Sequence, residues 1–479
     1  MKIEQFFLEG LGHQSYFVTD EQSGSAAVID PRRDVDIYLQ AAHRAGTRIT
    51  HILETHIHND YVTGARELAV QTNANIVAGA LSELAYEHQP VRDDERFSVG
   101  HLTFGVLATP GHTAEHVSYT LYESGHTTPD ALFSGGSLLV GNAGRTDLMG
   151  EAMTLTLTQQ QYQSLRRLLD TLPGQVRVYP THGAGSFCAS SSGVGPVRST
   201  TIAQERLANP AALAKDEAEF VQQQIAGYIA YPTYYKYMHD TNKNGPRILG
   251  TLPTPPALSP SMVQAHIRGG MPLVDSRNRE AFAHEHIPGS INVELDSSFG
   301  TYVGWILPFN TPLMLLIEDE QGCREAVVQL IRIGYERIDG YVDGGIESWK
   351  AAALPTSQLP SIDIETLYKR WSQREPLTIV DVRRPDEWND GHIPDALHLP
   401  LGDIPLHLDL LPTDQPLAVM CRSGHRAEIA ASMIAATGRE VLAVRGGMPD
   451  WINSGFPISV EKTPELAGPY GHDHTHAHP

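Results

Sequence analysis

The sequence predicts an α/β protein of several domains. With 479 residues the chain is too long for one hydrophobic core, and about 150 residues per domain suggests roughly three domains. Short β-like runs alternate with helical patterns, which favours helices layered on sheets, and the second half carries one set of motifs twice, which indicates a duplicated domain. The predicted divisions are a first domain over 1–200, a helical and proline-rich connector over 201–255, repeat domains over 256–355 and 360–460, and a histidine-rich flexible tail over 461–479.

The composition is that of an ordinary globular protein, with 41% hydrophobic and 19% charged residues. A net charge of −21 argues against nucleic acid, because phosphate binding needs a surplus of Lys and Arg. We expect a cytoplasmic protein without membrane association, since no apolar run reaches transmembrane length and the first residues lack signal-peptide features. The three cysteines, Cys188, Cys323 and Cys421, do not make a disulfide framework and fit a reducing compartment.

The first domain is predicted to alternate strands with helices. Helices are expected over 34–45, ended by Gly46, and over 63–70. The expected strands lie at 14–18, 26–30, 48–54, 102–108, 131–133 and 176–179.

One turn of this domain has the composition of a metal site. His56, His58 and Asp60 follow the expected strand at 48–54 in strict alternation. On an extended backbone such residues share one face, so two imidazoles and a carboxylate would point to one spot. These are metal-ligand types, although polar residues of a surface loop are the alternative interpretation.

Two further histidines follow strands of the same domain. His112 comes after the strand at 102–108, and His182 comes after the strand at 176–179. A lone histidine is more often structural, but histidines at several strand ends can meet at one sheet edge. The predicted metal ligands are therefore His56, His58, Asp60, His112 and His182.

These motifs carry a family resemblance. His56-x-His58-x-Asp60, Thr109-Pro110-Gly111-His112-Thr113 and Tyr179-Pro180-Thr181-His182-Gly183 resemble the metallo-β-lactamase fold. Gly144-Arg145-Thr146-Asp147 and the run over 231–238 resemble, more narrowly, the persulfide dioxygenases that are fused to rhodanese domains. The resemblance implies an αββα sandwich with one Fe(II) at its edge and the oxidation of a persulfide to sulfite.

The chain departs from that family at two positions. Family members with two metals have a histidine where this chain has Tyr61, so a single metal ion is expected. The dioxygenases have an aspartate ligand where this chain has Gly136, and water, His58 or Asp60 are the candidates to take its place beside Fe(II). A set of His56, His58 and His112 would instead be closer to a catalytic zinc site.

The connector is expected to be structural. A capped helix is predicted over 209–226, and the Tyr and Pro cluster over 228–237 is expected to pack between domains. A stiff proline-rich linker over 252–256 marks the boundary.

The second repeat has a candidate nucleophile. A buried-strand pattern over 416–420 ends at Cys421, and a helix is expected over 427–436. Unpaired backbone N–H groups of that helix, with Arg422 and Arg426, would lower the thiol pKa and favour the thiolate. The alternative is a small buried hydrophobic residue.

The loop Cys421-Arg422-Ser423-Gly424-His425-Arg426 resembles the rhodanese family. The resemblance implies that Cys421 carries sulfane sulfur, that the loop amides and Arg426 stabilise the persulfide, and that Arg422 helps bind an anionic donor. Ser423, Gly424 and His425 would line the substrate, and Asp381 with Arg383 would form a structural ion pair.

The first repeat is expected to be catalytically silent and to serve an interface. Carboxylates in the run Glu318-Asp319-Glu320 stand where the second repeat has its cysteine and arginines. Cys323 lies past the start of that loop.

The sequence therefore predicts an enzyme of sulfane-sulfur metabolism. Expected donors and acceptors are thiosulfate, glutathione persulfide or similar thiols, and a homo-oligomer is expected. The alternatives are a metal-dependent hydrolase of a thioester-type substrate with a rhodanese module, and a non-catalytic persulfide carrier or sensor. The tail, with His472, His474, His476 and His478, could bind metal loosely or be incidental.

Overall fold

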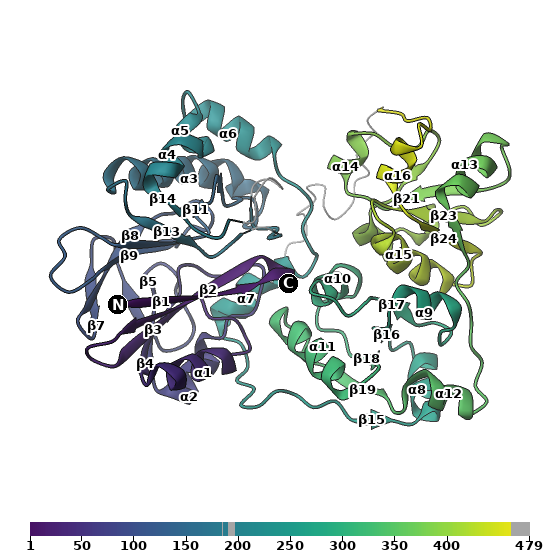
Figure 1. The fold of residues 1–479 in the computed structure, drawn as a ribbon, viewed down its shortest axis with the longest axis horizontal. Coiled ribbons are helices and arrows are strands. Elements are labelled where there is room, and N and C mark those ends of the chain that lie inside the picture. The colour runs from purple at the N-terminus through teal and green to yellow at the C-terminus, as the bar shows by residue number, and fades with distance from the viewer. Residues whose placement is uncertain (184, 190–196, 461–479) are drawn as a thin grey trace. The chain divides into compact units, whose positions relative to one another are not determined.

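The computed structural model describes residues 1–183, 185–189 and 197–460. The predicted tail over 461–479 lies outside this part of the chain. Contacts divide the described chain into two units, Met1–Leu252 and a second unit that begins at Pro253 (Figure 1). None of the helices in the described part is long and apolar enough to cross a membrane.

The first unit is built on two six-stranded sheets, each with its strands in a simple order. The first sheet has the order β1 (Lys2–Leu8), β2 (His13–Asp20), β3 (Ser25–Ile29), β4 (Arg48–Leu53), β5 (Asn75–Gly79) and β6 (Gln89–Val91). The second has the order β14 (Thr200–Thr201), β13 (Arg177–Pro180), β10 (Ala131–Gly135), β9 (Val117–Tyr122), β8 (Leu102–Ala108) and β7 (Arg96–Val99). A small pair, β11 (Leu138–Leu139) and β12 (Asn142–Ala143), follows β10.

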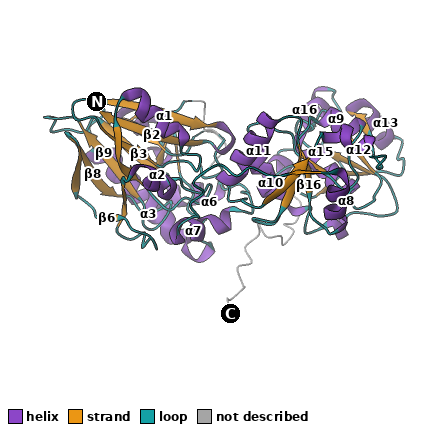
Figure 2. Ribbon diagram, turned by 90° about the horizontal axis from the view of Figure 1, so that it is seen from below, coloured by secondary structure: helices purple, strands orange, loops and turns teal. Residues whose placement is uncertain are grey.

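Three apolar cores hold the layers of this unit together. The core between the sheets contains buried residues of both, among them Tyr16, Phe104 and Phe133. Outer cores lie under α1 (Asp36–Ala45) and α2 (Ala65–Thr72) on one sheet, and under α3 (Glu151–Thr171) on the other. Figure 2 shows the strands in orange and the helices that cover them in purple. The predicted αββα sandwich is confirmed.

The connector contains more helices than the sequence predicts. The helix expected over 209–226 is two helices, α5 (Pro210–Leu213) and α6 (Glu217–Ala226), after α4 (Ile202–Ala208). Asn209 caps α5 and Asp216 caps α6 through their side chains, so a second N-cap interrupts the expected helix. A further helix, α7 (Tyr235–Asn244), follows.

The second unit contains two five-stranded parallel sheets with the same strand order, which confirms the predicted duplication. The first has the order β15 (Ala257–Leu258), β19 (Ile338–Val342), β18 (Leu313–Leu316), β16 (Leu273–Asp275) and β17 (Ile291–Asn292). The second has the order β20 (Ser361–Asp363), β24 (Val441–Arg445), β23 (Leu417–Met420), β21 (Thr378–Asp381) and β22 (Leu397–His398). Helices of the first copy are α8 (Pro260–Arg268), α9 (Arg279–His284), α10 (Phe299–Ile306), α11 (Glu320–Arg332) and α12 (Gly345–Ala351). Those of the second are α13 (Ile364–Ser372), α14 (Pro385–Asn389), α15 (His425–Ala435) and α16 (Met448–Asn453).

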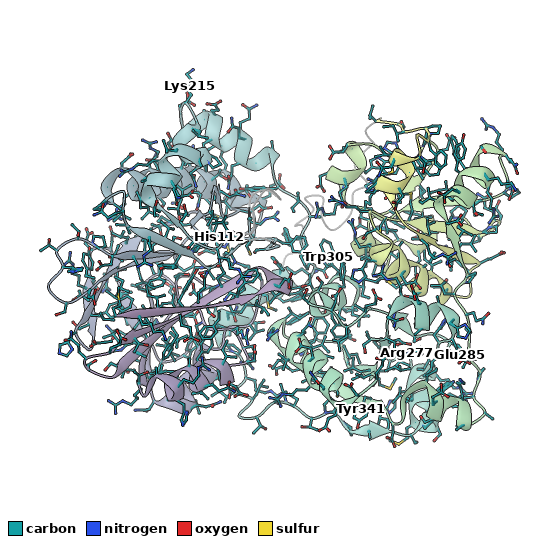
Figure 3. The ribbon with its side chains drawn as sticks, viewed as in Figure 1. His112, Lys215, Arg277, Glu285, Trp305 and Tyr341 are labelled. Carbon is teal, nitrogen blue, oxygen red and sulfur yellow. The ribbon has the colours of Figure 1, made fainter. Side chains whose placement is uncertain are left out.

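The same buried ion pair occurs in both copies. Arg383 binds Asp381 with an N–O distance of 2.7 Å, as predicted, and Arg277 binds Asp275 at 2.6 Å. Arg277 also donates to the carbonyl of Glu285 at 2.9 Å, and Figure 3 labels both residues. These arginines tie the end of a central strand to the following segment in each copy.

Candidate metal centre and sulfur-transfer loop

Three buried histidines meet at one end of the sandwich. His56, His112 (labelled in Figure 3) and His182 follow β4, β8 and β13, and each is at most 2% exposed. One ring nitrogen from each lies within 4.8 Å of those from the other two. The structure therefore groups His56 with His112 and His182.

Hydrogen bonds fix which nitrogen of each ring faces this cluster. The Nδ1 of His112 lies 2.7 Å from the carbonyl oxygen of Arg145, which can only accept, so Nδ1 carries the proton. Thr55 gives its hydroxyl proton to Asp30 at 2.8 Å and therefore accepts from Nδ1 of His56 at 2.9 Å. The Nε2 atoms of His56 and His112 are left with free lone pairs.

The imidazole of His182 is arranged like those of His56 and His112. Nδ1 of His182 lies 3.3 Å from Oδ2 of Asp60, and its Nε2 lies 3.5 Å from Nε2 of His56. Nε2 of His112 is buried without a hydrogen-bond partner among the described residues. Buried imidazoles whose Nδ1 atoms face oxygen atoms and whose Nε2 atoms face one another are suited to bind a metal ion.

The electrostatic setting keeps the rings of His56 and His112 neutral. Burial lowers the pKa of His56 well below its usual value, and neighbouring His58 and His112 add to the effect. Burial also lowers the pKa of His112, with His182 and His116 contributing. A metal ligand must be deprotonated at the binding nitrogen, so both rings are ready to bind.

The structure corrects the expected geometry of the His56 turn. The strand β4 ends at Leu53, and the chain bends from Thr55, so the alternation of an extended backbone does not continue to Asp60. His58 and Asp60 group with His182, whereas His56 groups with His112 and His182. His56, His58 and Asp60 therefore do not form one ligand group, although the rings of His56 and His58 lie 4.2 Å apart between centroids.

His58 also faces two buried carboxylates. Its Nε2 lies 3.1 Å from Oε2 of Glu54 and 3.4 Å from Oδ1 of Asp30. Burial alone would lower the pKa of His58, but Asp30 and Glu54 raise it to about 10. Asp30 and Glu54 thus favour the protonated form of His58, and these three side chains also form a group whose ligand atoms lie close together.

Gly136 stands where the dioxygenase aspartate is expected, and His116 contacts its backbone. A Cβ atom at Gly136 would lie 2.2 Å from Cδ2 of His112, so any side chain there requires His112 to move. The N–H of Gly136 donates to Nε2 of His116 at 3.0 Å, and Nδ1 of His116 lies 2.8 Å from the Thr109 hydroxyl. The predicted site did not include His116. Its position four residues after His112 could have identified it as a candidate. Its ring stacks on His56 with a centroid distance of 5.0 Å.

Arg145 links the cluster to the aromatic connector. Its guanidinium pairs with Asp147 at 2.7 Å and lies 5.2 Å and 4.6 Å from the ring centroids of Tyr228 and Tyr231. The hydroxyl of Tyr234 donates to the carbonyl of Asp60 at 2.9 Å. The connector was expected to pack between domains, and these contacts place it beside the histidine cluster of the first unit.

The Cys421 loop lies between a central strand and a helix of the second repeat. β23 ends at Met420, Cys421 is buried, and the N–H of Gly424 donates to its Sγ at 3.2 Å. Gly424 caps α15 with a φ of 88°, a backbone conformation that favours glycine. Arg422 and Ser423 are exposed, and His425 and Arg426 are half-buried.

Arg426 is held by an ion pair. Its guanidinium donates to both carboxylate oxygens of Glu387, at 2.6 Å and 2.8 Å. Burial opposes the charge on Glu387, but Arg426 lowers the Glu387 pKa to about 2. The pair fixes Arg426 at the start of α15, beside the loop that carries Cys421.

The first repeat has no nucleophile at the equivalent place. Asp275 pairs with Leu316 as Asp381 pairs with Met420, so Ile317 stands where the second repeat has Cys421. Ile317 is 6% exposed and cannot carry sulfur. The carboxylates predicted at this loop begin one residue later, at Glu318.

The chain thus combines two architectures. A sandwich of two sheets between helices has histidines at its edge, and two parallel sheets follow it, the second with a cysteine loop. Residues 8–182 match the metallo-β-lactamase superfamily, and residues 259–352 and 364–454 match the rhodanese-like domain. The chain belongs to the metallo-β-lactamase proteins of the persulfide dioxygenase type that are fused to two rhodanese domains.

Individual relatives agree with this assignment. The chain is 30% identical to human mitochondrial persulfide dioxygenase ETHE1 over 229 residues, 46% of this chain and 77% of the relative. It is 40% identical to a sulfurtransferase of Allochromatium vinosum over 98 residues, 20% of this chain and 92% of the relative. A metallo-β-lactamase structure from Staphylococcus aureus has a TM-score of 0.64 at 31% identity, covering 71% of this chain and 98% of that chain.

Hydrolases are also among the relatives. The hydroxyacylglutathione hydrolase of Rhodospirillum rubrum is 36% identical over 169 residues, 35% of this chain. The chain spans 60% of the length of that relative. The relatives therefore include a persulfide dioxygenase, a sulfurtransferase and hydroxyacylglutathione hydrolases.

Proposed function

We propose that Cys421 transfers sulfane sulfur and that the histidine cluster holds one metal ion that acts on a persulfide, with sulfite as the product. The observation that supports the first part most directly is the 3.2 Å contact from the Gly424 N–H to the Cys421 sulfur. A backbone donor aimed at that sulfur at a helix start stabilises negative charge there.

The sulfur-transfer step requires no external oxidant. The Cys421 thiolate attacks the outer sulfur of the donor, the donor S–S bond breaks, and sulfite or a thiolate leaves with the electron pair. Cys421 is then a persulfide, and an acceptor thiolate takes the outer sulfur and regenerates the Cys421 thiolate. The donors and acceptors proposed are thiosulfate, glutathione persulfide and similar thiols.

The proposed metal ligands are His56, His112 and His182. Imidazole ligands suit iron and zinc, and three neutral rings leave positions open for substrate. An Fe(II) ion held there would supply the redox chemistry that combines a persulfide with dioxygen. The overall change balances as one persulfide, one O2 and one water giving one thiol and one sulfurous acid. The chain contributes the orientation of His112 by the Arg145 carbonyl and the burial that excludes water.

The remaining predicted ligands keep supporting roles in this proposal. Asp60 orients His182, and His58 balances the buried charge of Asp30 and Glu54. Burial opposes the charge on Asp60, but His182 and His58 lower its pKa to about 2, so the carboxylate is ionised.

Oxygen uptake tests the proposal. Iron-loaded protein given glutathione persulfide is expected to consume one O2 for each sulfite formed, and His112→Ala should abolish both signals. Iron-loaded protein that forms no sulfite and consumes no O2 would contradict the metal-centre part of the proposal while leaving sulfur transfer to be measured separately.

A thioester hydrolase is the second candidate function. The supporting observation is the group of His58, Asp60 and His182, which offers a second set of ligand atoms beside the first. Against it, the buried ring of Tyr61 packs against His58 at 4.5 Å and His13 at 4.1 Å between ring centroids. Cleavage of a glutathione thioester by protein with two metal ions per chain would favour this function over the first.

A further inference from the structure

The cysteine-free repeat packs against the helix that begins at the Cys421 loop. The N–H of Asn292 in β17 donates to the Ser432 hydroxyl of α15 at 3.0 Å. Both Asn292 and Ser432 are buried. The first copy thus contacts the element that positions the nucleophile of the second copy.

The same surface extends to the loop residue His425. Its Nε2 lies 4.0 Å from Oε2 of Glu294, and its Nδ1 lies 4.0 Å from Oδ2 of Asp296. Glu294 is itself bound by the backbone N–H and the guanidinium of Arg279. The first copy therefore presents an organised set of polar side chains to the Cys421 loop.

Tyr302 lies in the centre of these contacts. It belongs to α10 of the first copy, on the same helix as Trp305 (Figure 3), and its ring meets His425 edge-on with a centroid distance of 4.8 Å. Burial raises the Tyr302 pKa, the Arg426 guanidinium opposes the rise, and Cys421 adds to it.

No described residue forms a hydrogen bond with the phenol of Tyr302, and its side chain is half-buried. Arg426, by contrast, is occupied by both oxygens of Glu387. A neutral O–H donor beside the nucleophile is thus available to an incoming molecule. Such a donor can bind the sulfur or oxygen atom that gains negative charge when the donor S–S bond breaks.

We propose that Tyr302, from the repeat without a cysteine, is a substrate-positioning residue of the Cys421 site and donates a hydrogen bond to the leaving group of the sulfur donor. The proposal rests on the proposed sulfur transfer at Cys421. It gives the first repeat a role in catalysis beyond packing. During transfer, the phenol keeps its proton and the leaving sulfite or thiolate keeps the electron pair of the broken S–S bond.

Tyr302→Phe tests the hydroxyl while keeping the ring against His425. A lost hydrogen bond to a charged group predicts a fall of about 10-fold in kcat/KM for sulfur transfer from thiosulfate to cyanide. The fall should be in kcat, because the bond strengthens as charge develops. Tyr341→Phe removes the same hydroxyl from a half-buried tyrosine on β19, and is expected to leave transfer unchanged.

The rate at which iodoacetamide alkylates Cys421 distinguishes a role of Tyr302 in positioning the sulfur donor from a general disturbance of the Cys421 loop. Tyr302→Phe should alter this rate by less than about two-fold, since the leaving group of this reagent, iodide, is a much weaker hydrogen-bond acceptor than sulfite. Full transfer activity in Tyr302→Phe together with a loss in Tyr302→Ala would mean that the ring only packs, and would overturn the proposal. Equal losses of transfer and alkylation would overturn it as well.

A different measurement tests the proposed sulfur transfer itself. Wild-type protein that forms no persulfide on Cys421, measured by mass spectrometry after thiosulfate treatment, would contradict sulfur transfer and this inference together. Normal persulfide formation with unchanged Tyr302→Phe kinetics would contradict the Tyr302 role alone.

Discussion

His112 donates its Nδ1 proton to the carbonyl oxygen of Arg145 over 2.7 Å. This bond leaves Nε2 as the only nitrogen of the ring that can bind a metal, and that atom is buried without a partner among the described residues. Arg145 is fixed in turn by Asp147 and by the aromatic connector. The metal centre is therefore coupled to a segment far from it in the sequence.

Asp147→Asn should weaken this orientation. The substitution removes the charge that holds the Arg145 guanidinium, so the Arg145 carbonyl becomes less well placed for His112. Loss of an outer contact of this kind is expected to reduce metal affinity about 10- to 100-fold. Competition with a chelator measures it, and Asp170→Asn, at an exposed ion pair of α3, is the control. Equal metal affinity in the two variants would contradict the role of Arg145.

Gly136→Ala should destabilise the first unit. The added Cβ would lie 2.2 Å from Cδ2 of His112 and 2.7 Å from its Nε2. Forcing such an atom into a packed site costs about 1–3 kcal/mol and displaces His112. Thermal unfolding and metal content should both decrease. The control is Gly269→Ala, at an ordinary φ of −78° with no atom nearer than 3.3 Å to the new Cβ, and a larger loss there than at Gly136 would contradict the account.

Sulfur transfer should depend on one of the three cysteines. Cys421→Ser is expected to abolish thiocyanate formation from thiosulfate and cyanide, because serine does not form a persulfide. Cys188→Ser and Cys323→Ser should retain it, since burial raises the pKa of both thiols and neither lies in the loop. Activity that survives Cys421→Ser would identify another nucleophile.

The ion pair between Glu387 and Arg426 predicts acid-dependent stability of the second repeat. The Glu387 pKa is lowered from 4.5 to about 2 in the folded state. Its contribution is therefore present above pH 4.5 and is lost as the pH falls toward 2. The shift corresponds to ~3 kcal/mol at neutral pH, as an order of magnitude. Glu387→Gln should flatten the loss of unfolding free energy between pH 5 and 3, and an unchanged slope would contradict the assignment.

The architecture and many of the site residues follow from sequence patterns. Histidines after β-like runs identify His56, His112 and His182 as strand-end residues, because strand patterns are local. The resemblance to the rhodanese family likewise identifies the ion pair of Asp381 with Arg383, and the structure adds the matching pair of Asp275 with Arg277. These features depend on residues that are close in the chain.

Other features depend on long-range packing, which sequence patterns do not reveal. The ring of His58 lies against that of His56, with 4.2 Å between centroids, but its Nε2 faces the buried carboxylates Asp30 and Glu54. Ile317 takes the cysteine position of the first repeat only through strand register. Tyr302 meets His425 because two repeats pack together, and nothing in its own surroundings along the chain indicates this contact.

Metal content tests most directly whether His56, His112 and His182 form the metal centre. The protein is prepared without residues 471–479, so that the tail histidines do not contribute, and iron and zinc are measured by mass spectrometry in folded protein. We expect about one ion per chain in wild type and in His51→Ala, a histidine on β4 outside the cluster, and a large loss in His182→Ala. Full metal content in His182→Ala, with loss in His58→Gln, would contradict this ligand set and favour the one with His58.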